Sequence, residues 1–111
     1  MSSVFSVEQF EMVFGKSRDA VFFVEKEGTD YRYVHVNEAA TKLINTNPTD
    51  KLVGQVVPPH VAKNIFSYYD QTLQTGEQVE FEDYTYAEKE VRKQRTSTVP
   101  VVEGGRHYVL A

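Results

Sequence analysis

Hydrophobic and polar residues change their spacing at Asn37, and this change marks the stretch around which the chain is organised. From Tyr31 to Val36, aromatic and β-branched residues alternate with other residues, which favours a pleated, half-buried strand. Asn37 is a typical helix N-cap, because its side-chain oxygen can accept a hydrogen bond from a backbone N–H of the first turn. The apolar residues that follow are spaced as on one side of a helix, which Asn45 ends. The pattern predicts a strand that leads directly into a capped helix.

The residues before this stretch predict a short helix and a first strand. Ser6 and Gln9 have the spacing of a capping box, and the apolar residues up to Gly15 lie on one side of a helix. Residues 19–25 are apolar on both faces, as is usual for a strand with a neighbour on each side. A turn over residues 26–30 returns the chain, so we expect an antiparallel hairpin.

The middle of the chain predicts an irregular segment and then a long helix. Residues 45–60 hold three of the four prolines, and we expect one helical turn over residues 49–52. Pro59 suits a first helical turn, and residues 60–74 carry apolar side chains at helical spacing. Gly76 stands where a left-handed residue commonly ends a helix. The expected anchors of the irregular segment are Leu52, Val53, Val56 and Val57.

The end of the chain predicts three strands joined by tight turns. Lys93 and Arg95 are expected to pair across a hairpin with the acids of the neighbouring strand. Pro100 cannot donate to a ladder, so we place it at an edge or a bulge. The expected strands are residues 78–86, 91–102 and 107–111, and the expected turns are residues 88–90 and 103–106.

This order of elements predicts an α+β fold with about five strands in one antiparallel sheet and helices on one face. The chain has 111 residues, enough for one domain with one core. We divide it into an N-terminal amphipathic cap helix, residues 1–15, and a domain over residues 16–111. The last strand looks truncated, so we expect a domain excised from a longer protein.

Composition and charge exclude several classes of function. The chain has 16 acidic and 12 basic residues and a net charge of −4, which argues against binding to nucleic acid or to an anionic membrane surface. The absence of cysteine excludes disulfides, thiolate nucleophiles and cysteine-based metal sites. No apolar run is long enough to span a membrane, and the N-terminus is not a secretory signal. We therefore expect a cytoplasmic domain.

Six short segments stand in an order and spacing that resemble those of the PAS sensory domain family. They are residues 10–14 with 17–24, 33–40, 52–54, 75–77 and 98–101, and the resemblance runs from Val7 to Ala111. The aspartate-containing exit motif of that family is absent. The resemblance implies a sheet that half-encloses a pocket under its helices. It also implies a sensing or dimerising role beside an attached output domain: a histidine kinase, a cyclic-dinucleotide enzyme or a transcription regulator.

The residues argue against most cofactors of that family. Its light-sensing flavin branch forms a cysteine adduct and its cinnamoyl chromophore is attached to a cysteine, so the absence of cysteine excludes both. A redox-active flavin commonly lies beside tryptophan, which the chain lacks. Haem needs an axial ligand, usually histidine. His60 stands at the start of the long helix, His35 is expected on the sheet face away from the pocket, and His107 is in the last strand, so haem is a weak third hypothesis.

Two hypotheses about function remain open. In the first, an unknown small ligand occupies a pocket in which Tyr69 and Thr98 are the orienting groups; the alternative is that the same residues simply form the core. The candidate pocket residues are Phe22, Val24, Val36, Leu43, Ile65, Tyr69, Phe81, Thr98 and Leu110.

In the second hypothesis, the domain binds no ligand and forms a homodimer through its first helix. We do not expect an enzyme. Glu80, Glu82 and Asp83 alternate as solvated positions do, Ser97 has no local base, and no glycine-rich phosphate loop is present. The candidate dimer residues are Val4, Phe5, Phe10 and Phe14.

Overall fold

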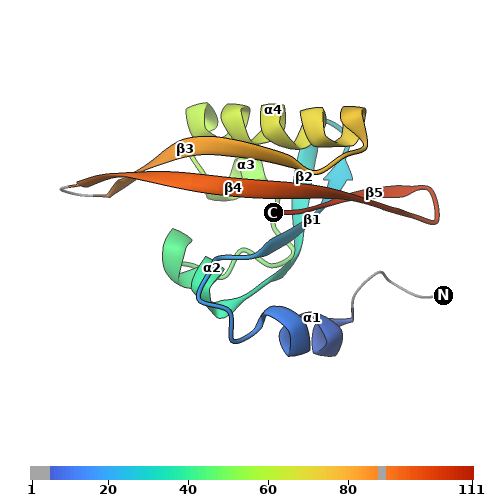
Figure 1. The fold of residues 1–111 in the computed structure, drawn as a ribbon, viewed down its shortest axis with the longest axis horizontal. Helices are drawn as coiled ribbons and strands as arrows, with labels where there is room; N and C mark the ends of the chain where they lie inside the picture. Colours follow the sequence, from blue (N-terminus) through green and yellow to red (C-terminus); the bar gives the residue numbers. More distant parts are fainter. Residues whose placement is uncertain (1–5, 88–89) are drawn as a thin grey trace.

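Five strands and four helices make up the described part of the chain, residues 6–87 and 90–111 of a computed structural model (Figure 1). Residues 88–89 of the expected turn, and Val4 and Phe5, lie outside the described residues. The elements are α1 (Val7–Phe14), β1 (Phe22–Glu27), β2 (Asp30–Val36), α2 (Glu38–Ile44), α3 (Val53–Val56), α4 (Pro59–Thr75), β3 (Val79–Ala87), β4 (Glu90–Glu103) and β5 (Arg106–Leu110).

The strands form one antiparallel sheet in the order β2-β1-β5-β4-β3, which confirms the predicted fold class. β1 has a neighbour on each side, as its two apolar faces indicated. A bulge interrupts the pairing of β1 and β2: Phe23 pairs with His35 and Val24 with Tyr33, so Val34 is the extra residue of β2. The bulge shifts the alternation of β2, and both Val34 and His35 pack with Phe23.

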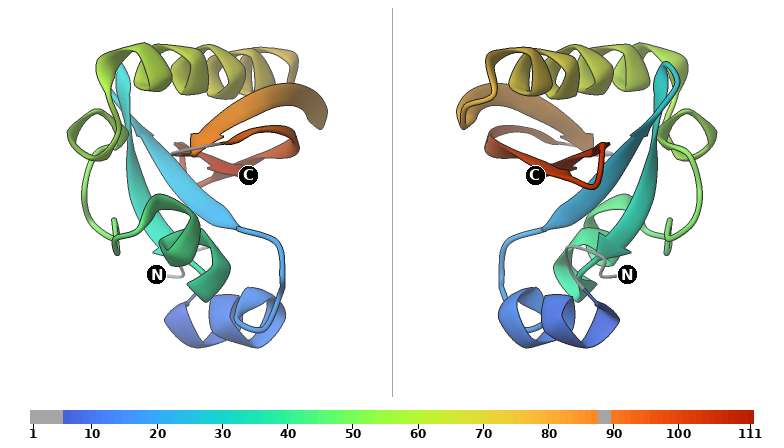
Figure 2. Two further views of the ribbon diagram at one scale, coloured as in Figure 1. Left: turned by 90° about the vertical axis from the view of Figure 1, so that its left-hand side faces the viewer. Right: turned by 90° about the vertical axis from the view of Figure 1, so that its right-hand side faces the viewer.

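Two hydrophobic clusters pack against opposite faces of the sheet, and Figure 2 shows helices α4 and α1 on opposite sides of the strands. Helices α3 and α4 cover the inner face, as predicted. Helix α1 lies on the outer face, because Phe10 packs there with Phe23 and Tyr108. We call these three residues the outer cluster. The inner cluster consists of Val24, Tyr31, Tyr33, Val53, Ala62, Tyr69 and Val109.

Two predicted boundaries are wrong. The helical turn lies at Val53–Val56 rather than at residues 49–52, because the side chain of Gln55 accepts a hydrogen bond from the Leu52 N–H and so starts the helix there. β1 begins at Phe22 rather than at Asp19, because the backbone of residues 19–21 is bound to a side chain instead of to a strand.

The expectations for β4 are met where the structure describes them. β3 pairs with β4 as far as Val79 and Thr98, so Pro100 lies just past the end of β3, where its missing N–H leaves no ladder bond unmade. Arg95 lies 3.8 Å from the Glu82 carboxylate, and both side chains are exposed, so this ion pair contributes less than about 1 kcal/mol. The Lys93 and Asp83 side chains lie outside the described residues.

Candidate ligand-binding hollow

A hollow of about 550 Å³ lies between the start of β1, helix α2 and the middle of β4, a volume in the usual range for small-molecule sites of ~300–1,000 Å³. We call it the β4 hollow. Its walls come from four parts of the chain that lie far apart in the sequence. The lining residues are Phe14, Asp19, Ala20, Val21, Phe22, Leu43, Arg95, Thr96, Ser97, Val99, Leu110 and Ala111.

The Asn37 side chain holds one wall of this hollow together. Its Nδ2 donates to the carbonyl oxygens of Phe14 at 3.0 Å and Asp19 at 2.8 Å. Its Oδ1 accepts from the N–H groups of Val21 at 3.0 Å and Ala40 at 2.9 Å. The residue is fully buried and every hydrogen-bonding group of its amide has a partner. Three of the four partners line the hollow, so this residue determines the shape of the wall.

Three of the nine predicted pocket residues, Phe22, Leu43 and Leu110, line the hollow. Leu43 is also partly open to solvent, with 44% of its surface exposed. Leu110 was expected on the inner face, and this is wrong: it packs against the outer cluster, because Val109 takes the inward position of β5.

The other six predicted residues lie in or against the packed core beneath α4. Tyr69 meets Tyr31 edge-on with ring centroids 5.0 Å apart, and Phe81 stacks on Tyr68 at 4.3 Å. Burial raises the pKa of Tyr33 to about 12, which is expected for a phenol in a dry interior. The six residues are Val24, Val36, Ile65, Tyr69, Phe81 and Thr98.

Thr98, predicted as an orienting group, instead joins β4 to α4. Its Oγ1 lies 2.5 Å from the Thr72 Oγ1, and both residues are fully buried. The Thr72 Oγ1 also lies 2.9 Å from the Tyr68 carbonyl oxygen, and the Thr98 Oγ1 lies 3.2 Å from that of Val79, so the two hydroxyl hydrogens serve two of these three contacts. This is a polar link inside an apolar layer, where an unpaired hydroxyl would be costly.

We expect Thr98→Val to lower the free energy of unfolding by about 1–2 kcal/mol, because it leaves a buried partner with fewer hydrogen bonds. Adding Thr72→Val should cost less than the two single changes summed, because the contact is shared. Urea unfolding of the three variants measures both quantities. Additive costs would mean that the two hydroxyls do not interact.

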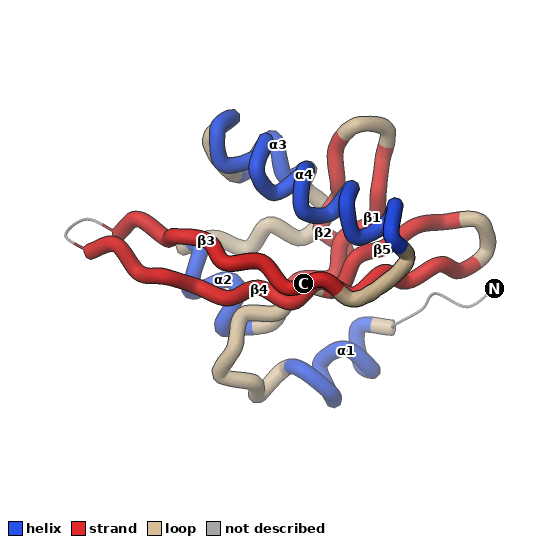
Figure 3. Tube along the Cα trace, turned by 45° about the horizontal axis from the view of Figure 1, so that its top comes forward, coloured by secondary structure: helices blue, strands red, loops and turns tan. Residues whose placement is uncertain are grey.

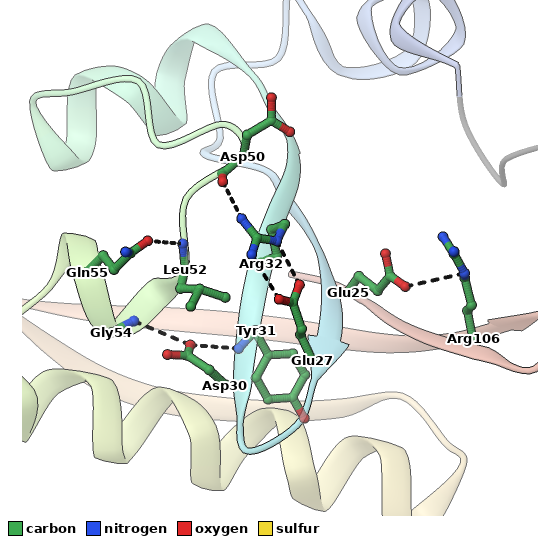
Figure 4. A network of polar contacts seen from close by, with 10 residues as sticks. All are labelled: Glu25, Glu27, Asp30, Tyr31, Arg32, Asp50, Leu52, Gly54, Gln55 and Arg106. Atoms are coloured by element: carbon green, nitrogen blue, oxygen red, sulfur yellow. Dashed lines mark hydrogen bonds and ion pairs between the residues drawn. The ribbon is translucent and has the colours of Figure 1, made fainter.

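A second polar network covers the free edge of β2 (Figure 4). Arg32 donates from Nε and Nη2 to the Glu27 carboxylate at 2.7 and 2.8 Å, and from Nη1 to the Asp50 carbonyl. The hydrogen bond from Arg32 lowers the pKa of Glu27. The backbone of Tyr33 also bonds to Asp50 and Lys51. The loop before α3 is thereby attached along β2.

Asp30 places Gly54 at the start of α3 in the same network. Its Oδ1 accepts from the Gly54 N–H at 3.3 Å, and a Cβ at this glycine would lie 2.7 Å from the other carboxylate oxygen. A larger residue at position 54 would therefore push the carboxylate away. This contact explains the glycine in the short motif at residues 52–54.

Asp70 on α4 accepts hydrogen bonds from the Tyr31 hydroxyl at 2.6 Å and from the Lys26 ammonium at 3.0 Å. Partial burial opposes ionisation of Asp70, but these two donors outweigh it, and the pKa falls below its ordinary value. Burial, with the Asp70 contact, raises the pKa of Tyr31. The three residues attach α4 to the β1–β2 hairpin.

Because the pKa of Asp70 is lower in the folded state, its contribution to stability is present above the unfolded pKa of about 3.9 and is lost as pH falls through the folded pKa. We expect wild type to lose stability relative to Asp70→Asn over this acidic range, by less than about 1 kcal/mol since the carboxylate is 43% exposed. Thermal unfolding from pH 6 to about pH 2 measures the difference. If wild type and Asp70→Asn lost stability in parallel over this pH range, the lowered pKa of Asp70 would be contradicted.

The histidines lie apart from one another. His35 stacks on Phe10 and Phe23 at the outer face, away from the inner cluster as expected, and His60 and His107 are exposed. Within residues 6–87 and 90–111, no group of three or more acidic, histidine or cysteine side chains is placed to hold a metal ion. None of the described helices is long and apolar enough to cross a membrane.

The candidate dimer residues on α1 face the domain itself. Phe10 is only 1% exposed, and Phe14 is half-buried with its ring centroid 5.1 Å from that of Phe10. The prediction that the Phe10 side chain contacts a partner is wrong for this structure, because the ring already packs against Phe23 and Tyr108 on the outer face of the sheet. The exposed apolar residues of α1 are Val7, Met12 and Val13.

Known proteins resemble this chain in sequence profile and in fold. The model of the family described as PAS fold matches residues 14–111. The solved PAS domain of Bordetella pertussis BvgS is 15% identical, with 93% of this chain and 80% of that chain covered and a TM-score of 0.73. A domain of an HTR-like protein from Haloarcula marismortui is 14% identical, with 85% and 95% covered and a TM-score of 0.67. No curated protein matches the chain.

Proposed function

Because the chain belongs to the PAS fold family, whose model matches residues 14–111, we propose that it is a signal-input domain of a larger signalling protein and binds a small ligand in the β4 hollow. The hollow is the observation that carries the proposal. It has ligand-sized volume, apolar walls from Phe22 and Leu43, and polar groups at Thr96 and Ser97, the combination typical of ligand sites.

A ligand in the β4 hollow would contact both strands of the sheet and a segment that is not part of the sheet. β4 and β5 are paired strands, whereas residues 14–21 are attached through the Asn37 side chain. A ligand that binds one arrangement of these segments more tightly than another shifts the equilibrium toward it. Phe14, the last residue of α1, is bonded to Asn37 in the same wall. A shift of the wall would therefore also shift α1 on the outer face of the domain. The proposed readout is the geometry of a homodimer in the cytoplasm, passed to an attached kinase, cyclic-dinucleotide enzyme or transcription regulator.

A pair of matched variants tests the ligand site. Ala20→Phe fills the β4 hollow, whereas Ser67→Phe adds the same ring to a more open groove between α3 and α4. A compound at about 100 times its Kd should raise the melting temperature of wild type and of Ser67→Phe by about 10 °C. Ala20→Phe should not respond. Equal responses from both variants, or no response to any class of metabolite, would refute ligand binding in the hollow.

The second candidate function is a ligand-free dimerisation module, and the exposed side chains of α1 favour it. Met12 is 85% exposed, and Val7 and Val13 are more than half exposed. In that case Met12→Glu should separate a dimer into monomers without changing the melting temperature, as sedimentation equilibrium and calorimetry would show. A dimer that survives Met12→Glu would remove α1 as the contact.

A further inference from the structure

Helix α4 lies on the outside of the molecule, with α3 beside it (Figure 3). A groove of about 440 Å³, which we call the α4 groove, runs between the two helices. Its apolar floor is held in place, because Ala62 is buried and the Phe66 ring stacks on Tyr31 with the ring centroids 6.1 Å apart. The residues of α4 that line the groove are Pro59, Ala62, Lys63, Phe66, Ser67 and Asp70.

Two opposite charges of α4 line this groove without pairing with each other. Lys63 and Asp70 stand about 10 Å apart along the helix, which is too far for an ion pair. The Asp70 carboxylate already accepts from Tyr31 and Lys26, but both donors bind its Oδ1. Among the described residues, no acid pairs with the Lys63 ammonium and no donor binds the Asp70 Oδ2. Both groups are therefore available to a partner outside the domain.

The spacing of these charges fits a second copy of the same helix. When a two-fold axis crosses two identical helices, the helices run antiparallel, and each residue meets the residue that lies equally far on the other side of the axis. Lys63 and Asp70 lie equally far from the midpoint between Phe66 and Ser67. With the axis at that midpoint, Lys63 of each copy is opposite Asp70 of the other, so one contact contains two ion pairs.

The residues between the two charges suit close packing of helices. Successive residues of an α-helix are ~100° apart, so Lys63 and Asp70 lie within ~20° of one line along α4. Phe66 and Ser67 lie on either side of that line. Ser67 is small and exposed, which lets two helix axes approach to about 8–10 Å. Phe66 adds an aromatic ring whose burial favours association.

We propose that the α4 groove is the contact of a homodimer, in which the α4 helices of two copies pack antiparallel about a two-fold axis between Phe66 and Ser67. The partner is a second copy because α4 is complementary to itself: each copy supplies both charges and half of the apolar contact. Asp70 then connects Lys63 of the second copy to the β1–β2 hairpin. This inference rests on the homodimer of the proposed function and specifies its interface.

Sedimentation equilibrium of charge variants tests the ion pairs. Lys63→Glu turns both attractive contacts into repulsive ones, so the dissociation constant of the dimer should rise about tenfold or more. Lys16→Glu makes the same change of charge at an exposed position just after α1, and should leave the constant within about twofold of wild type. Added salt should weaken the wild-type dimer and strengthen the Lys63→Glu dimer, because it screens attraction and repulsion alike.

Because the chain has no cysteine, single introduced thiols give a second test. Ser67→Cys should form a disulfide between two copies on mild oxidation, because its two sulfur-bearing residues lie only about 1.5 Å apart along the paired helices. Gln71→Cys is also exposed and one turn further along α4, where the two residues lie about 13 Å apart along the helices. It should crosslink about tenfold more slowly, as intact-mass measurements over time would show.

Three results would overturn the proposed interface. Equal rates of crosslinking at the two positions would mean that the thiols meet only by random collision. A dimer that Lys63→Glu leaves unchanged would use another contact, such as α1, and would keep the homodimer of the proposed function. A monomer at every concentration would reject that homodimer as well. The ligand response of wild type and Ala20→Phe tests the β4 hollow separately.

Discussion

Asn37→Ala is expected to lower the free energy of unfolding by about 4 kcal/mol, a large part of the ~5–15 kcal/mol that stabilises a domain. The change removes the cap of α2, worth about 1 kcal/mol. It also leaves the Val21 N–H and the carbonyls of Phe14 and Asp19 without their partner in a part-buried site. Each such group costs about 1 kcal/mol or more. Denaturant unfolding monitored by circular dichroism measures the loss.

Two further variants give this prediction its controls. Asn37→Asp keeps the acceptor for Ala40 and Val21 but turns a carboxylate toward two carbonyl oxygens, so it should destabilise nearly as much as Asn37→Ala. Asn47→Ala removes an exposed turn asparagine and should cost less than about 1 kcal/mol. If Asn37→Asp proved as stable as wild type, the bonds to Phe14 and Asp19 would contribute nothing.

Phe10→Ala is expected to cost about 3–4 kcal/mol, because it empties the contact between α1 and the outer face of the sheet. The ring is 1% exposed and its centroid lies 5.1 Å from that of His35. Met12→Ala, on the same helix with an 85% exposed side chain, should change stability by less than about 0.5 kcal/mol. Calorimetry of the two variants compares a buried and an exposed position on one helix.

The same two positions distinguish packing of α1 on its own domain from dimerisation through α1. If α1 packs on its own domain, Phe10→Ala lowers the melting temperature without changing the mass in solution. If Phe10→Ala were as stable as wild type but became a monomer, Phe10 would contact a second copy of the chain. In that case α1 would leave the outer face of its own sheet in the dimer.

Local features of the fold were predictable from the sequence because they depend on neighbours along the chain. The caps at Ser6, Asn37 and Gly76 each have their structural role, and Gly76 is left-handed as expected. These positions follow from hydrogen bonds within a few residues. The order of strands and helices followed from spacing and from turn residues in the same way.

Features that depend on distant residues were not predictable. The cap of α2 by Asn37 was foreseen, but its bonds to Phe14, Asp19 and Val21 span 16 to 23 residues, and only the folded chain brings them together. The face of Leu110 was mistaken because a short strand gives little evidence for its alternation.

The candidate site was predicted only in part, for the same reason. Phe22 and Leu43 were found from their apolar pattern, but Arg95 and Ser97 are brought to the hollow by the pairing of β4 with β3 and β5, which joins distant parts of the chain. The space beneath α4, where a pocket was expected, is filled by aromatic rings such as Tyr69 and Phe81. Volume filled by side chains does not follow from a one-dimensional pattern.

Native mass spectrometry of the purified protein, compared with the same sample denatured, tests the central claim most directly. The account predicts an added mass that disappears on denaturation, that Ser67→Phe retains, and that Ala20→Phe loses because its ring fills the β4 hollow. A dimer of unmodified mass in all three samples would contradict it and favour an interaction module that binds no ligand.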